Sequence, residues 1–187
     1  MSKVTCFISY SHESTNMNKF NRINQLVNNS TSLINYSERE NKSNFSKETI
    51  WKYLHDRIAG SSCTILLYTQ DLATYRRDKI DYIPGDFLNS GWVYNEISAS
   101  LRDWDDNRIN GLICVLCDGI RLVSNGAKGL PLPRILTVRE NYEYIVWVPY
   151  EDFINNPSRY IKEALRKREE QIKIRKYDIK HDPHNER

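Results

Sequence analysis

The chain has 187 residues, of which 40% are hydrophobic and 27% charged, so it has the length of one domain and enough apolar residues to fold, which excludes an intrinsically disordered protein. Its formal net charge of +3 is too small to indicate binding to nucleic acid. Because no apolar run approaches the roughly 18 residues of a membrane-spanning helix, and no secretory signal is visible, we expect a cytoplasmic protein without a membrane segment.

Runs of Val, Ile, Leu and aromatic residues predict four buried strands and a weaker fifth. Their nearly continuous apolar character is typical of strands covered on both faces, as in a parallel sheet between layers of helices. Segments with apolar residues at helical spacing separate them. In chain order we expect a strand at Val4–Tyr10, a helix at Asn18–Asn28, the weak strand at Ser32–Tyr36, a helix at Lys47–Ile58, a strand at Cys63–Thr69, a helix from Ser90 to about Trp104, strands at Leu112–Cys117 and Tyr144–Val148, and a helix from Asn155 to about Lys176.

Alternating strands and helices, joined by right-handed connections, predict a doubly wound α/β fold. We expect a flavodoxin-like parallel sheet of five strands in the order 2-1-3-4-5, with helices on both faces. In this order the ligand crevice opens beyond the carboxyl ends of strands one and three, where the winding direction reverses. Residues 1–177 are expected to form this single domain, and residues 178–187 a flexible tail.

Two connections do not fit the regular pattern. Residues Asp71–Asn89 form a long connection that is either a functional lid, a partner contact or a plain insertion. Residues Gly119–Arg139 contain several Gly and Pro residues and are expected to be mainly loop.

The four cysteines, Cys6, Cys63, Cys114 and Cys117, lie in or beside the most apolar segments, so we expect them to be buried and reduced. Cys114 and Cys117 have Cys-x-x-Cys spacing. Residues three apart on a strand point to opposite faces, however, which argues against both a zinc site and a disulfide. The histidines form no metal-ligand pattern either, and no metal site is predicted.

Polar residues follow the first strand at the predicted crevice. Ser9, Tyr10, Ser11 and His12 offer hydroxyl groups and helix-start amides that can bind a phosphate, although hydroxyl groups are common at any helix start. The weak second strand is also followed by hydroxyl-bearing residues, Tyr36 and Ser37.

The run Trp92-Val93-Tyr94-Asn95-Glu96-Ile97 places a carboxylate one helical turn after a Trp. At about 100° per residue, Glu96 lies at the edge of the apolar stripe of this helix and can reach the crevice. A carboxylate beside a ribose can stabilise the oxocarbenium-like cation that forms when a glycosidic bond breaks. The spacing is also compatible with an exposed Glu favoured by the helix dipole, and Trp92 can either stack on a base or pack in the core.

The segment Cys6-Phe7-Ile8-Ser9-Tyr10-Ser11-His12 and the Trp92-x-x-x-Glu96 helix together resemble the signatures of TIR domains (Toll/interleukin-1 receptor type), over roughly residues 3–150. The closer likeness is to the TIR subunit of bacterial Thoeris antiphage systems. The receptor-type Arg-Asp-x-x-Pro-Gly loop after the second strand is missing, which weakens a receptor-adaptor interpretation. The resemblance implies that Glu96 is the catalytic residue, and the candidate nucleotide-binding residues are Ser9, Tyr10, Ser11, His12, Tyr36, Ser37 and Trp92.

The resemblance also implies an enzyme that cleaves the nicotinamide–ribose bond of NAD and makes a cyclic or conjugated ADP-ribose signal. NAD is then a substrate, and no cofactor is expected. The implied partners are a separate effector protein, a phage-derived trigger and further copies of the chain on activation, but neither nucleic acid nor a membrane. Two alternatives stay open: a non-enzymatic TIR scaffold, and an enzyme resembling nucleoside deoxyribosyltransferases, which would act on nucleosides and ignore NAD.

Overall fold

The computed structural model of the chain describes residues 3–11, 16–30, 33–35, 52, 56–73, 91–102, 108–122, 134–137 and 139–174. Within them, parallel strands form a sheet in the order β2-β1-β3-β4-β5. This order confirms the predicted flavodoxin-like fold of five parallel strands. The strands are β1 (Val4–Ser9), β2 (Leu33–Asn35), β3 (Cys63–Tyr68), β4 (Gly111–Leu116) and β5 (Val146–Pro149).

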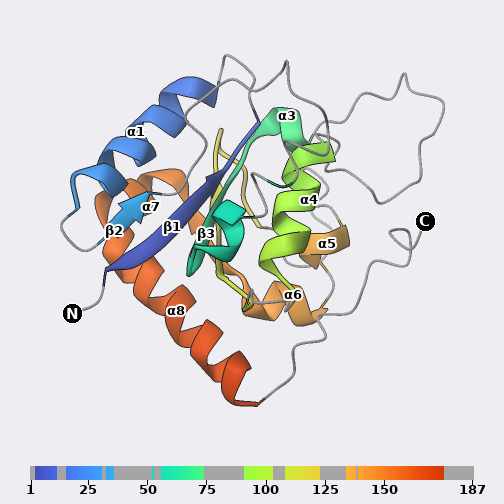
Figure 1. The fold of residues 1–187 in the computed structure, drawn as a ribbon. Coiled ribbons are helices and arrows are strands. Elements are labelled where there is room, and N and C mark those ends of the chain that lie inside the picture. The colour runs from blue at the N-terminus through green and yellow to red at the C-terminus, as the bar shows by residue number, and fades with distance from the viewer. Residues whose placement is uncertain are drawn as a thin grey trace.

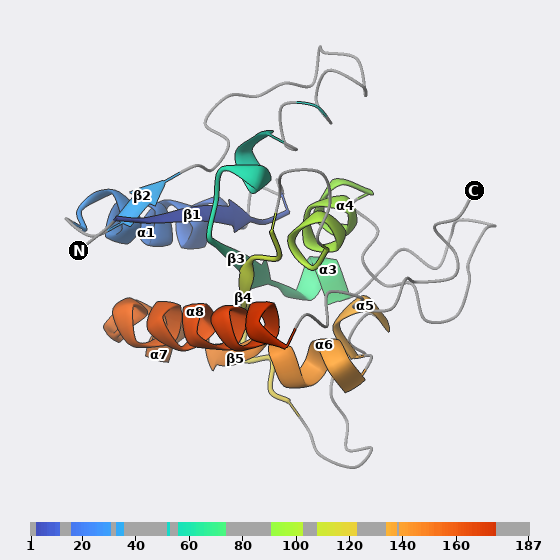
Figure 2. The ribbon, with the colours of Figure 1, turned by 60° about the horizontal axis from the view of Figure 1, so that its bottom comes forward.

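Helices cover both faces of the sheet, as Figures 1 and 2 show. The helices are α1 (Met17–Asn28), α3 (Gln70–Ala73), α4 (Gly91–Ser100), α5 (Arg134–Thr137), α6 (Arg139–Tyr144), α7 (Tyr150–Asn155) and α8 (Pro157–Lys173). A hydrophobic core that we call the α8-side core joins one face to α1, α7 and α8, and includes Ile8, Phe20, Ile65, Val115, Phe153 and Ile161. The α4-side core joins the other face to α4, α5 and α6, and includes Leu66, Tyr68, Ile97, Leu116, Leu136 and Tyr144.

Strands β3 and β4 are buried along their whole length. Ile65 and Leu67 of β3 point into the α8-side core, while Leu66 and Tyr68 point into the α4-side core. Apolar side chains are therefore favoured on both faces of these strands, which explains why they appear in the sequence as nearly continuous apolar runs.

The cysteines follow the same alternation. Cys114 belongs to the α4-side core and Cys117 to the α8-side core, so the two thiols lie on opposite faces of the sheet, as predicted. All four cysteines are buried and free. Burial, and secondarily the neighbouring Cys117, raises the pKa of the Cys114 thiol well above its usual value, so this thiol stays protonated.

The sequence predicts mainly loop at residues 119–139, and the described part of this range includes the short helix α5 and the first residue of α6. Residues 123–133 and 138 lie outside the described residues. The second half of the chain differs from the prediction in two places. Tyr144 ends α6 and does not begin the last strand, which starts at Val146. The expected carboxy-terminal helix begins at Pro157 instead of Asn155, and a separate short helix that was not predicted, α7, ends at Asn155. The physical reason is Pro157, because a residue that precedes proline is disfavoured in the helical conformation.

Other predicted segments are described only in part. The connection after β3 begins with the short helix α3, and the rest of residues 74–90 lies outside the described residues. Of the helix expected at 47–58, residue 52 and residues 56–59 are helical, and the remainder lies outside the described part. So does the tail at 178–187. None of the described helices is both long and apolar enough to cross a membrane.

Helix α8 is held close to the sheet. Arg168 Nε donates to the carbonyl of Ile109 at 2.6 Å, and Lys167 Nζ donates to that of Glu143 at 2.7 Å. About one turn earlier in the same helix, Ala164 lies against Gly111 of β4, where a Cβ on Gly111 would lie 2.7 Å from the Ala164 carbonyl oxygen. The backbones therefore approach each other too closely for any side chain at this position.

We predict that Gly111→Ala lowers the free energy of unfolding by about 1–3 kcal/mol, because the added methyl group must push α8 away from β4. Urea denaturation monitored by circular dichroism measures this loss. Lys162→Ala, at an exposed position of the same helix, is the control and should change stability by less than about 0.5 kcal/mol. Equal stability of Gly111→Ala and the wild-type protein would contradict the close packing.

Candidate functional site

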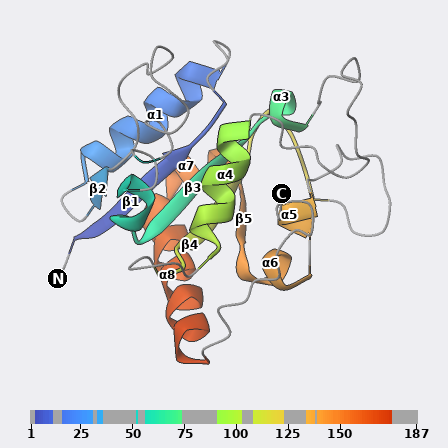
Figure 3. The same ribbon diagram turned by 45° about the vertical axis from the view of Figure 1, so that its right-hand side comes forward.

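The carboxyl ends of β1 and β3 lie side by side at the point where the winding of the sheet reverses. Ser9, the last residue of β1, is in register with Leu66 of β3. Helix α4 contacts both strands and lies along β3 (Figure 3). Because α4 follows the carboxyl edge in the chain, its early turns start near this edge. In doubly wound folds this is the usual place for a ligand.

Glu96 is the charged residue at this position. The residue is only 6% exposed, and its helical neighbours Val93 and Ile97 are apolar core residues, so its carboxylate lies in a largely apolar environment. The Ser9 hydroxyl donates a hydrogen bond to Glu96 Oε2 at 2.6 Å, and this bond is buried. A buried carboxylate is costly unless hydrogen-bond donors replace its water, so this contact stabilises Glu96 in its buried position. The structure therefore rules out the alternative of an exposed Glu.

Side-chain alternation along β1 determines which polar residues meet Glu96. Ser9 points to the α4 side of the sheet, whereas Tyr10 points to the α8-side core. There the Tyr10 ring stacks on Phe20 of α1, with ring centroids 4.0 Å apart. Tyr10 thus packs α1 against β1, on the other face from Glu96.

The remaining predicted site residues are placed only in part. Ser11 is buried just beyond the end of β1. Trp92 lies in the first turn of α4, but its side chain is not among the described ones. His12, Tyr36 and Ser37 lie outside the described residues. The structure therefore brings together Glu96 and Ser9 from the predicted set.

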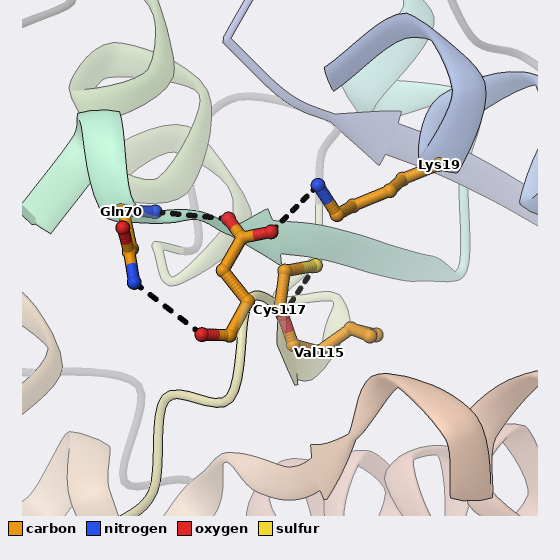
Figure 4. Close-up of polar contacts among 5 residues, drawn as sticks. Lys19, Gln70, Val115 and Cys117 are labelled. Carbon is orange, nitrogen blue, oxygen red and sulfur yellow. Dashed lines mark hydrogen bonds and ion pairs between the residues drawn. The ribbon is translucent and has the colours of Figure 1, made fainter. Parts of the chain in front are cut away.

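A second polar group at the same edge of the sheet was not predicted (Figure 4). Asp118 follows β4 with a φ of 54°, in the left-handed region that Asp tolerates better than most residues. Its Oδ1 lies 2.7 Å from Lys19 Nζ of α1, and its Oδ2 accepts from the backbone N–H of Gln70 of α3 at 3.3 Å. The turn Asp118-Gly119, directly after an apolar strand, is the sequence signal that could have identified this group.

The Asp118 contacts tie α1 and α3 to the end of β4 across the carboxyl end of β3. Burial alone would lower the pKa of Lys19, but the hydrogen bond and charge of Asp118 outweigh it, with help from Cys117 and Tyr150, so the pKa is raised. Lys19 is therefore held in its charged form beside the candidate site.

Among the described residues, no group of three or more His, Cys, Asp or Glu side chains could hold a metal ion. Because the Asp118 carboxylate is paired with Lys19, the chemistry that the predicted site residues offer is that of the oriented Glu96 carboxylate. Such a group can stabilise a positive charge, bind a hydroxyl group or accept a proton.

The fold and the site define a flavodoxin-like α/β protein that holds one carboxylate where the winding reverses. Residues 7–82 match the family model described as Thoeris protein ThsB, TIR-like domain. The match confirms the resemblance to Thoeris TIR-like domains for the part of the chain that holds the first motif. It includes Ser9 and ends before Glu96, so the α4 helix lies outside the matched range. No curated protein matches the chain.

We predict that Ser9 and Glu96 are energetically coupled. Ser9→Ala removes the donor to a buried carboxylate and should cost about 1.5–3 kcal/mol of unfolding free energy. In the Glu96→Gln background the same substitution should cost less, because a hydrogen bond to a neutral amide oxygen is weaker. A double-mutant cycle from urea denaturation measures this difference. Additive effects of the two substitutions would show that the bond is not formed in solution.

The ion pair between Lys19 and Asp118 should contribute under about 1 kcal/mol, because both side chains are partly exposed. A raised pKa in the folded state means that this stability is fully present below the unfolded pKa of 10.5 and is lost as pH rises through the higher folded pKa. The difference in unfolding free energy between wild type and Asp118→Asn should therefore stay constant from neutral pH to about pH 10 and shrink above it. A difference that grows at high pH would contradict this assignment.

Proposed function

We propose that this protein is a TIR enzyme that consumes NAD, releases nicotinamide and converts the remainder into a cyclic or conjugated ADP-ribose signal for a separate effector. The observation that carries the proposal is the buried Glu96 carboxylate, held by Ser9 at the switch point of the sheet. The match of residues 7–82 to a Thoeris TIR-like domain supports the same assignment.

The proposed reaction breaks the bond between ribose C1′ and the nicotinamide nitrogen. The electron pair of this bond leaves with nicotinamide, which departs as a neutral ring, and positive charge develops on the ribose. The Glu96 carboxylate stabilises this charge or briefly traps the cation as an ester. A nucleophile then attacks C1′ and loses its proton. Water gives ADP-ribose, a group of the same molecule gives a cyclic product, and another molecule gives a conjugate.

Ser9 is proposed to act as the residue that orients Glu96. Its hydroxyl group fixes one carboxylate oxygen by a short bond, so the carboxylate keeps a defined direction without substrate. Preorganised charge of this kind stabilises a transition state better than a mobile side chain, because no reorganisation is needed during the reaction. The low exposure of Glu96 fits a site that opens only on activation or self-association.

We predict that Glu96→Gln lowers NAD turnover by at least about a hundredfold. The amide oxygen of Gln can still accept from Ser9, so the fold should persist while the negative charge is lost. Purified protein, alone and with lysate from phage-infected cells, is incubated with NAD, and nicotinamide and ADP-ribose species are followed by mass-resolved chromatography. Glu169→Gln, at an exposed position of α8, is the matched control and should keep full activity.

The other outcomes separate the alternatives. An intact NAD pool in both conditions, with partner binding unaffected by Glu96→Gln, would favour a non-enzymatic TIR scaffold. Base exchange on nucleosides that spares NAD would favour a deoxyribosyltransferase-like enzyme. Loss of NAD that persists in Glu96→Gln would show that the reacting carboxylate lies elsewhere.

A further inference from the structure

A line of buried polar side chains runs from the backbone of Glu96 to the amino-terminal ends of β3 and β4. Ser100, one turn after Glu96, donates from its hydroxyl group to the Glu96 carbonyl at 2.8 Å. The Ser100 and Thr64 hydroxyl oxygens are 2.8 Å apart, and Asn110 Nδ2 donates to Thr64 Oγ1 at 3.2 Å. All three side chains belong to fully buried residues.

The protons of these groups can be assigned by counting. Ser100 has one hydroxyl proton, and it goes to the Glu96 carbonyl, so Thr64 must be the donor in the Thr64–Ser100 bond. Thr64 Oγ1 then accepts from Asn110. The bonds therefore all run in one direction, from Asn110 through Thr64 and Ser100 to the backbone of Glu96. Hydrogen bonds in such a chain polarise and strengthen each other.

Asn110 is the fixed end of this line. Its amide nitrogen also donates to Ser61 Oγ at 2.7 Å, and Ser61 in turn donates to the Ile58 carbonyl. The Asn110 backbone donates to the Ser100 carbonyl at 2.8 Å and accepts from the Tyr144 hydroxyl at 2.6 Å. Rotating the Asn110 amide by half a turn would bring its oxygen against hydroxyl groups whose protons are already donated elsewhere, so its orientation is determined.

From this geometry we infer that Thr64, Ser100 and Asn110 are positioning residues, which set how far α4 slides along the sheet and thereby where Glu96 stands relative to Ser9. The α4 residues Val93 and Ile97 pack in the α4-side core, and apolar contacts of this kind have little directional preference. The hydrogen bonds of Ser100, at the carboxyl-terminal end of α4, and the Ser9 bond to Glu96 add two directional constraints on the position of α4. The inference rests on the proposed function only for its consequence on turnover.

The test compares Thr64→Val, which keeps the shape and removes the hydroxyl group, with Thr5→Val on the neighbouring strand. Thr5 is a matched control because its hydroxyl contacts Ser62 at 3.3 Å, and Ser62 is not part of the line from Asn110 through Thr64 to Ser100. For Thr64→Val we expect kcat for NAD to fall about tenfold or more while KM changes less than about twofold, because a small misplacement of a reacting group slows the chemical step. Thr64→Ser should restore kcat, and Thr5→Val should leave it unchanged.

Amide hydrogen exchange supplies a second reading that does not depend on activity. The Leu101 and Asn110 amides, which donate to the Ile97 and Ser100 carbonyls, should exchange faster in Thr64→Val than in Thr5→Val. If Thr64→Val does not fold, Ser100→Ala tests the same line with a smaller change.

Each result decides something different. Wild-type exchange and wild-type kcat in Thr64→Val or Ser100→Ala would overturn the inference, and so would an equal loss in Thr5→Val. Faster exchange confined to α4 and Asn110, in a protein that never consumes NAD, would overturn the proposed function and leave the positioning role standing.

Discussion

Glu96 of α4 is only 6% exposed, so its carboxylate needs a hydrogen-bond donor, and this requirement links it to Ser9 of β1. The link is possible because two unrelated constraints agree. Alternation along β1 directs Ser9 to the α4 side of the sheet, and the order of strands places the end of β1 beside β3, where α4 packs. A shift of one residue in β1 would turn Ser9 to the other face and leave Glu96 buried without this donor.

The two faces of the sheet differ in how closely they are packed and in how many polar side chains they bury. On the α8 side, packing is close and mostly apolar: Tyr10 stacks on Phe20, and α8 passes over Gly111 with backbone contact. On the α4 side, hydroxyl and amide groups interrupt the apolar core at Ser100, Thr64 and Asn110. We interpret the first face as the rigid support of the domain and the second as the face that orients the candidate carboxylate.

Much of the architecture could be predicted because a buried strand can be identified from the apolar residues of its own short segment. Continuous apolar runs such as those of β3 and β4 indicate strands covered on both faces, and this led to the correct strand order. The errors occurred where a boundary depends on a single residue. Pro157 sets the start of the carboxy-terminal helix and keeps Asn156 out of it, and Tyr144, which we expected to begin the last strand, ends α6 and packs in the α4-side core.

For the site, the sequence by itself determined which residue types are available and where along the chain they stand: a Glu one turn after a Trp, and hydroxyl groups after the first strand. Only the tertiary structure decided which of them meet. It paired Ser9 with Glu96, turned Tyr10 to the opposite face, and joined Asp118 to Lys19 and Gln70 from two other elements. The reason is physical. The Ser9–Glu96, Lys19–Asp118 and Gln70–Asp118 contacts join residues between 48 and 99 positions apart in the sequence, and no local sequence pattern encodes contacts over such separations.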